Sequence, residues 1–429
     1  MNEVTVLSQN FVKIRFVAPV VLVNTRMEVS AQMNTLHWFS LAALLIVSQA
    51  NANGPAVSTK GGIQITSSNS AFSFKLGGRV MWDIDSFDGV LNRSNGGSRR
   101  LSADLRRSRL ELSASAYDDW KFKFDVDIKD KPGGSNAQLH TVGVGYTGLG
   151  GFDIFVGRTK EPFGLEELTS SKSISSIERN YYTEATDTDS QPQFGIRLDG
   201  KDSNVGWSVG LFNPVGGPKK DNGGDRIAFT GRLFGAPINT GSKTLHLGIA
   251  VTDRNIDQPL QHTGFGLDIA ESGGKLDSSS LTIDSDRQWG LEGLYISGPF
   301  SLQSEVFAKK VGGANGGPDG NVQHYYAQAT YSLTGERRGY KAKSGIADIV
   351  KPSADGWAIE LVGKWDHIEL DIDGVPTEEV SGYLGGLNLY PNKNVKLMLN
   401  VIRVTSENIA VNNDDNAATV ISTRLQFAF

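Results

Sequence analysis

The last nine residues of the chain, ISTRLQFAF, alternate between two kinds of side chain. The odd-numbered positions from Ile421 to Phe429 are mostly apolar, whereas the even-numbered positions between them are polar or small. In a strand, these two sets lie on opposite faces. A strand with one face in lipid and the other in water has this pattern, and a terminal aromatic ring fits the aromatic girdle at a membrane surface. The segment therefore predicts a transmembrane β-barrel rather than a soluble β-protein.

The composition agrees with a turn-rich, all-β membrane protein. The chain has 50 glycines, 14 prolines and a mean hydropathy of −0.25. Beyond the N-terminal region, no apolar run approaches the roughly 18 residues that a membrane-spanning helix needs. Without such helices, the backbone must satisfy its hydrogen bonds in a closed barrel. The absence of cysteine excludes disulfides and thiolate chemistry, and a net charge of −5 gives no indication of nucleic-acid binding.

The N-terminal region is similar to a secretory signal peptide. Residues 36–47 form an apolar core, and Ala50-Asn51-Ala52 is a small-x-small cleavage signature. Residues 1–32 precede this core, and two explanations stay open: an over-extended start, or a leader with an unusually long n-region. In both cases we expect residues 1–52 to lie outside the fold. We expect residues 53–70 to form a short periplasmic lead-in, and the barrel to occupy residues 71–429.

Alternation with a period of two predicts sixteen strands after residue 52. These are residues 71–85, 104–117, 119–129, 138–148, 152–158, 192–200, 204–212, 225–234, 243–254, 286–297, 299–310, 322–333, 356–372, 379–390, 394–404 and 418–429. The prediction is a 16-stranded antiparallel transmembrane β-barrel with both ends on the periplasmic side. Short and long connections alternate, with long ones at 159–191 and 255–285. The link 334–355 departs from this rule. Counting strands from the periplasmic N-terminal end places it on the periplasmic side, yet it is long.

The charged residues decide which face of each strand looks inward. In 119–129, four apolar side chains oppose five charged ones, Lys121, Lys123, Asp125, Asp127 and Lys129. A Lys or Arg turned to lipid near the midplane costs about 2–4 kcal/mol, so the charges must face the lumen. Arg106 breaks the alternation of 104–117, and we expect it to reach the membrane interface from the strand end. A charged interior is wet, and a barrel of this size encloses an aqueous channel.

Four segments carry a resemblance to a known family. They are 157–179 (GRTKEPFGLEELTSSKSISSIER), 332–340 (SLTGERRGY), 384–400 (LGGLNLYPNKNVKLMLN) and 424–429 (RLQFAF). Together they resemble the phosphate-selective porin O/P family, and the likeness extends from about residue 61 to the end. The resemblance implies a homotrimeric channel in the outer membrane lipid, with an inward-folding loop at 159–191. It also implies basic lumen residues that conduct anions, phosphate in the best-known members.

Basic side chains are suited to guide anions through a constriction. Arg offers a planar fork that matches phosphate oxygens, Lys offers a movable charge, and a row of moderate sites lets an ion step onward. The candidate anion contacts are Arg79, Arg107, Arg109, Lys123, Lys160, Lys172, Arg197, Arg226, Arg232 and Arg254. We expect Arg107, Arg109, Lys123 and Lys160 nearest the constriction. The alternative for any one arginine is that it only braces the wall against a facing carboxylate.

The loop 159–191 also carries acidic residues beside the proposed anion path. We expect Glu161, Glu166 and Glu167 to anchor this loop to wall arginines rather than to touch the solute. Glu178-Arg179 is predicted to be a further clamp of the same kind.

Other functions are less well supported by the residues. The six histidines fall singly, without a metal-binding spacing, so neither an enzyme nor a cofactor is indicated. The loop Asn412–Asp415 fits either a surface Ca²⁺ site or a solvated tip. A general, weakly selective porin remains the alternative channel, and residues 53–70 are too few to plug the barrel. We predict passive diffusion of anions, preferentially phosphate or related oxyanions, across a bacterial outer membrane.

Overall fold

The computed structural model describes most of the chain beyond the leader. The described residues are 54–59, 61–129, 136–185, 192–213, 226–263, 267–270, 274–276, 279–353, 356–408 and 417–429. The predicted leader, residues 1–52, and the acidic tip Asn412–Asp415 lie outside the described residues. Within the described part, no helix combines the length and the apolar character needed to cross a bilayer.

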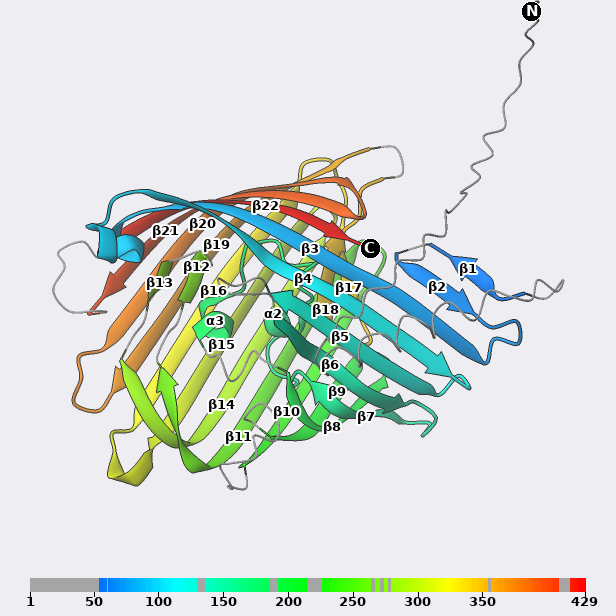
Figure 1. The fold of residues 1–429 in the computed structure, drawn as a ribbon, viewed down its shortest axis with the longest axis horizontal. Helices are drawn as coiled ribbons and strands as arrows, with labels where there is room; N and C mark the ends of the chain where they lie inside the picture. The colour runs from blue at the N-terminus through cyan, green and yellow to red at the C-terminus, as the bar shows by residue number, and fades with distance from the viewer. Residues whose placement is uncertain are drawn as a thin grey trace, which may run out of the picture. The chain divides into compact units, whose positions relative to one another are not determined.

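Sixteen antiparallel strands form a closed barrel (Figure 1). They are β3 (Phe72–Phe87), β4 (Arg100–Ala116), β5 (Trp120–Lys129), β6 (Asn136–Tyr146), β7 (Phe152–Thr159), β8 (Gln193–Asp202), β9 (Val205–Asn213), β10 (Arg226–Asn239), β11 (Lys243–Thr263), β14 (Ser280–Ser297), β15 (Phe300–Gly313), β16 (Gly320–Ser332), β19 (Ala358–Ile372), β20 (Glu378–Asn392), β21 (Val395–Glu407) and β22 (Ala417–Ala428). Each strand pairs with the next, and β22 pairs with β3 to close the barrel. The predicted fold class is confirmed, with strand bounds that differ by a few residues in most cases.

A small hairpin precedes the barrel. β1 (Ala56–Ser58) pairs with β2 (Ile63–Thr66), and β2 continues the sheet at the start of β3. The segment predicted as a lead-in therefore contains two short strands.

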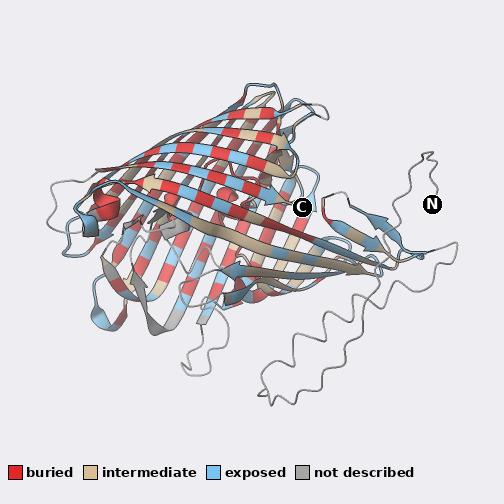
Figure 2. Cartoon of the chain, turned by 45° about the horizontal axis from the view of Figure 1, so that its top comes forward, coloured by how far each residue is buried: buried red, intermediate tan, exposed pale blue. Residues whose placement is uncertain are grey.

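Buried and exposed residues alternate along the strands, as Figure 2 shows. On β21, Leu397, Leu399 and Val401 are apolar and exposed, whereas Lys396 and Asn400 between them are almost fully buried. The terminal residue follows the same wall, because Phe429 exchanges backbone hydrogen bonds with Gly78 at 3.0 and 3.1 Å. An apolar outer face and a polar inner face are the arrangement expected of a barrel in lipid.

Three segments fold into the space inside the ring of strands (Figure 1). One is the loop after β7, described at residues 160–185, which we call the constriction loop; it contains α2 (Leu165–Leu168) and α3 (Tyr181–Ala185). The second is the hairpin of β12 (Leu267–Ala270) and β13 (Gly274–Leu276), and the third is the hairpin of β17 (Arg338–Lys341) and β18 (Ile346–Val350). Two short 3-10 helices, η1 (Gly89–Asn95) and η2 (Ala314–Gly316), complete the elements.

The β17–β18 hairpin explains why the link 334–355 is long on the periplasmic side. Its Ala347 is buried against Leu294 and Ile296 of the wall and Leu165 of α2. The link has the topology that parity predicts, and its extra length is used to fill the lumen. The predicted long loop 255–285, by contrast, is shorter than expected, since β11 continues to Thr263 and β14 begins at Ser280.

The interior is less uniformly polar than the alternation suggests. Inward-facing apolar side chains of the wall, including Ile368, Val380 and Val404, pack in one cluster with Ile177 and Tyr181 of the constriction loop. This packing fills part of the barrel near β19 to β22. The cations that stay in contact with water are found elsewhere on the wall.

A β-bulge places Arg106 in the lumen. The pairing of β3 with β4 shifts register between Met81–Arg107 and Asp83–Asp104. Because a bulge adds a residue to one strand, the simple alternation fails there. Arg106 and Arg107 therefore both reach inward, and the expectation that Arg106 extends to the membrane interface is wrong.

Candidate functional site

The constriction loop is held to the inner wall by hydrogen bonds at many points. Glu305 of β15 accepts the backbone N–H groups of Leu165, at 2.5 Å, and Glu166, at 3.0 Å. Asn400 of β21 accepts the N–H of Ile177 at 2.8 Å. The described part of the loop thus leaves β7 and reaches strands on other sides of the barrel, where wall side chains fix its position.

The acidic residues of the loop are paired with cations. Glu161 binds Arg254 of β11 at 3.0 Å, and Glu166 lies 3.5 Å from Lys364 of β19. The Glu161 contact agrees with the predicted anchoring to a wall arginine, whereas the wall partner of Glu166 is a lysine. Glu167 differs, because its partners in the described structure are the loop's own Lys160 and Arg179.

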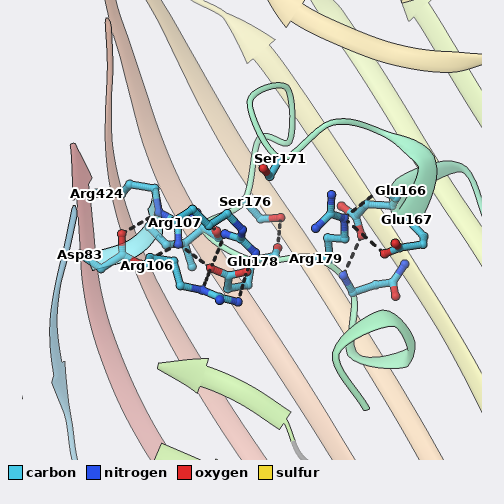
Figure 3. Close-up of polar contacts among 12 residues, drawn as sticks. Asp83, Arg106, Arg107, Glu166, Glu167, Ser171, Ser176, Glu178, Arg179 and Arg424 are labelled. Atoms are coloured by element: carbon cyan, nitrogen blue, oxygen red, sulfur yellow. Dashed lines mark hydrogen bonds and ion pairs between the residues drawn. The ribbon is translucent and has the colours of Figure 1, made fainter. Parts of the chain in front are cut away.

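Glu178 is the strongest anchor of the loop (Figure 3). Arg106 donates to its carboxylate at 2.8 and 3.0 Å, Arg107 at 2.9 and 3.2 Å, and Arg424 of β22 makes a further contact. Although burial opposes the charged form, these guanidinium groups hold the pKa of Glu178 well below its usual range. Asp83 of β3 is the second carboxylate here, and it binds Arg424 at 2.6 and 2.7 Å.

Glu178 and Arg179 do not form one joint clamp. Glu178 points to the arginines of β4 and β22, whereas Arg179 donates to the backbone carbonyls of Glu166 and Thr169. The loop thus uses adjacent residues to bind the wall and to brace its own turn (Figure 3).

Arg79 and Lys172 share a single carboxylate across the gap between wall and loop. Lys172 donates to Glu111 of β4 at 2.7 Å, and Arg79 of β3 forms an ion pair with the same residue. Arg79 also donates to Ser171 at 2.5 Å. Asp125 of β5 lies directly opposite Glu111 on the neighbouring strand, so two cations and two carboxylates meet where the loop contacts the wall.

Arg109 and Arg197 are each paired with a carboxylate. Arg109 makes two hydrogen bonds of 2.6 Å to Asp127. Arg197 lies 2.9 Å from Asp199 and donates to Thr159 at the end of β7. Their side chains remain 12% and 23% exposed, so both still contact water.

The side chains of Arg232 and Arg254 are more deeply buried than those of Arg109 and Arg197. Arg232 binds Glu292 and donates to the carbonyls of Ser344 and Gly345, and its side chain is 1% exposed. Arg254 bridges Asp286 and Glu161 and is 3% exposed. Both positions fit the wall-bracing alternative. The side chain of Arg226 lies outside the described residues.

A row of exposed lysines lies at the periplasmic end of the barrel, where β3 pairs with β2 beyond its pairing with β22. Lys75 of β3 and Lys123 of β5 flank Ser113 of β4 on either side, and Lys121 precedes Lys123 on the same face. All three are exposed, and within the part of the chain that the structure describes, none forms an ion pair. Lys121 donates to the backbone carbonyl of Asp118. We call these three residues the lysine row.

Sequence reasoning left Lys75, Lys121 and Arg106 out of the candidate set. For both lysines a signal existed, since they alternate with apolar residues of their strands. Two adjacent arginines within an otherwise alternating strand are the signal of a bulge.

A closed sixteen-stranded barrel with an apolar outer face and an inward-folded loop surrounded by cations defines an outer-membrane porin. The chain belongs to the family described as phosphate-selective porin O and P, whose model matches residues 74–429. It is an anion-selective channel of a bacterial outer membrane.

Known relatives and structures agree with this family. Porin O of Pseudomonas aeruginosa is 31% identical over 408 residues, which cover 87% of this chain and 92% of the relative. An anion-selective porin from Comamonas acidovorans has a TM-score of 0.54 at 14% identity, covering 83% of this chain and 100% of that one. The channel DcaP of Acinetobacter baumannii has a TM-score of 0.53 at 12% identity, covering 84% and 98%. These two structures share the fold.

Proposed function

We propose that this channel passes phosphate and related oxyanions in preference to other anions. The observation that carries the proposal is the lysine row, Lys75, Lys121 and Lys123, whose ammonium groups are exposed and outside any ion pair among the described residues. A cation that already binds a carboxylate has most of its charge neutralised. Free ammonium groups keep theirs, and the low-dielectric wall concentrates their field in the lumen.

Two lysines of the constriction loop extend this path. Lys172 is 27% exposed and Lys160 is 20% exposed, so both can be reached by a hydrated ion passing the loop. Arg107 and Arg109, at 12% each, are less accessible. An anion leaving the loop would next meet the lysine row. A series of moderate sites permits binding without trapping the ion.

Planar-bilayer recordings test the proposal. In a KCl gradient, we expect the reversal potential to shift toward that of chloride, because fixed cations favour anions in the pore. Added phosphate should block the chloride current at micromolar to millimolar concentration, since it competes for the same groups. A cation-selective trace would overturn the proposal. A non-selective trace without phosphate block would instead support a general porin.

We also propose that the channel is a trimer, with the sector around β7 at the subunit contact. β7 has 8 residues, which span about 26 Å along the strand. The hydrocarbon core is about 30 Å thick, and a tilted strand covers less of it than its length. A second subunit covering this short strand would shield the exposed membrane edge.

The oligomer is tested with two matched substitutions on the outer face. Val156 of β7 and Leu291 of β14 are 42% and 47% exposed. We expect Val156→Trp to dissociate the trimer, because the added ring clashes with a neighbouring subunit, and Leu291→Trp to leave it intact in lipid. Light scattering of the detergent-solubilised protein measures the number of chains. Equal behaviour of the two variants would argue against a contact at β7.

A further inference from the structure

A group of three metal-ligand side chains lies on the outer face of the barrel. His367 and Glu369 of β19 and Glu379 of β20 place one donor atom each within 4.8 Å of the others. Their strand positions alternate with inward-facing Asp366 and Ile368, so the group faces away from the lumen. It lies near the extracellular ends of these strands, apart from the anion path.

Carboxylates within and beside this group lie opposite one another and repel unless a cation is bound. Glu369 lies directly opposite Glu379, and Glu379 lies directly opposite Glu407 of β21. Like charges at directly opposed positions of a sheet are destabilising. Among the residues that the structure describes, no Lys or Arg forms an ion pair with Glu369, Glu379 or Glu407. A bound cation would convert this repulsion into attraction.

His367 is held in the orientation that a metal ligand needs. Its Nδ1 lies 2.7 Å from the hydroxyl of Ser381, and its Nε2 lies 2.8 Å from Glu369. In the tautomer with the proton on Nδ1, His367 donates to Ser381 and presents the lone pair of Nε2 to the carboxylates. The rings of Tyr325 and Trp365 pack at 4.9 and 6.3 Å from the imidazole and restrict its rotation. Such outer-shell hydrogen bonding is usual for histidines that bind metals.

We propose that His367, Glu369 and Glu379 bind a divalent transition metal, with Zn²⁺ as the best match. One imidazole nitrogen and two carboxylate oxygens are a common zinc donor set, with bonds of about 2.0–2.2 Å. The two glutamate side chains are flexible enough to close onto an ion from their present spacing. The metal replaces the proton between His367 and Glu369, and it ties β19 to β20 on the outer surface. The remaining coordination position takes water.

Calorimetric titration of Zn²⁺ into the full-length channel in detergent tests the site. We expect one ion per chain, and a loss of at least tenfold in affinity in both His367→Gln and Glu379→Gln, because each variant lacks one ligand. Ser381→Ala should weaken binding by about 10–100-fold, the usual effect of losing the partner of a ligating histidine. Zn²⁺ should also raise the thermal unfolding midpoint of the wild type, since it binds only the folded barrel.

His140→Gln is the matched control, because His140 lies on β6 outside the group. It should bind Zn²⁺ like the wild type. Unchanged affinity in both His367→Gln and Glu379→Gln would overturn the site, as would the absence of binding to the wild type. The reversal potential should be the same in His367→Gln and Glu379→Gln as in the wild type, so failure of the metal site is distinguishable from failure of the proposed anion path.

Discussion

Glu178→Gln is expected to destabilise the barrel by about 3–5 kcal/mol, the usual cost of removing one partner from a buried ion pair. Three guanidinium groups, from Arg106, Arg107 and Arg424, meet at this carboxylate, and its side chain is 10% exposed. Without the charge, the guanidinium groups repel one another in a site that has lost most of its water. The free energy of unfolding, from urea titration followed by tryptophan fluorescence, measures the loss. The conductance should also rise, because the loop loses its attachment to β4 and β22.

Two further variants separate this effect from a general change in lumen charge. Asp125→Asn removes a lumen carboxylate that forms no ion pair with another described residue and lies opposite Glu111, so we expect stability to change by no more than about 1 kcal/mol. Adding Arg106→Gln to Glu178→Gln should restore part of the stability, since one of the repelling charges is removed. If Asp125→Asn and Glu178→Gln had equal effects, the arginine cluster would not be what holds the loop.

The barrel itself could be predicted from the sequence because lipid and water impose a strict alternation on each strand. Five charges in residues 119–129 leave one choice of inward face, and Asp127 of this set binds the lumen residue Arg109. The bulge in β4 could not be predicted with the same rule, because it changes the parity within one strand. The inward fold of the β17–β18 hairpin could not be predicted either, because a long periplasmic link has no alternating pattern that indicates where it folds.

The candidate site was less accessible to sequence reasoning. Parity identifies which arginines face inward but not which of them meet a carboxylate from a distant segment. Arg232 is neutralised by Glu292, 60 residues away, and covered by the carbonyl of Gly345. Lys123 has the same inward parity but remains exposed. The difference depends on how the inward segments pack, which the strand pattern does not encode.

Reversing the charge of the lysine row is expected to abolish the anion preference. The triple variant Lys75→Glu, Lys121→Glu and Lys123→Glu replaces three positive charges with three negative ones at the same lumen positions. Two unit charges 4 Å apart interact by about 1 kcal/mol even in bulk water. This interaction energy falls with distance and with added salt. A tenfold change in permeability ratio needs about 1.4 kcal/mol, which six units of charge readily supply. The reversal potential in a KCl gradient should move from the chloride side toward zero or beyond it.

The control for this variant makes an identical change of charge outside the lumen. Lys243 and Lys310 are exposed residues that alternate with buried, inward-facing ones, and exposed Lys393 lies in the turn between β20 and β21. Replacing all three with Glu should leave the reversal potential nearly unchanged, because water and salt screen charges that the ion does not pass closely. If both triple variants shifted the potential equally, selectivity would come from the net charge of the protein. A shift confined to the lysine row would show that the exposed ammonium groups on the inner wall select the ion.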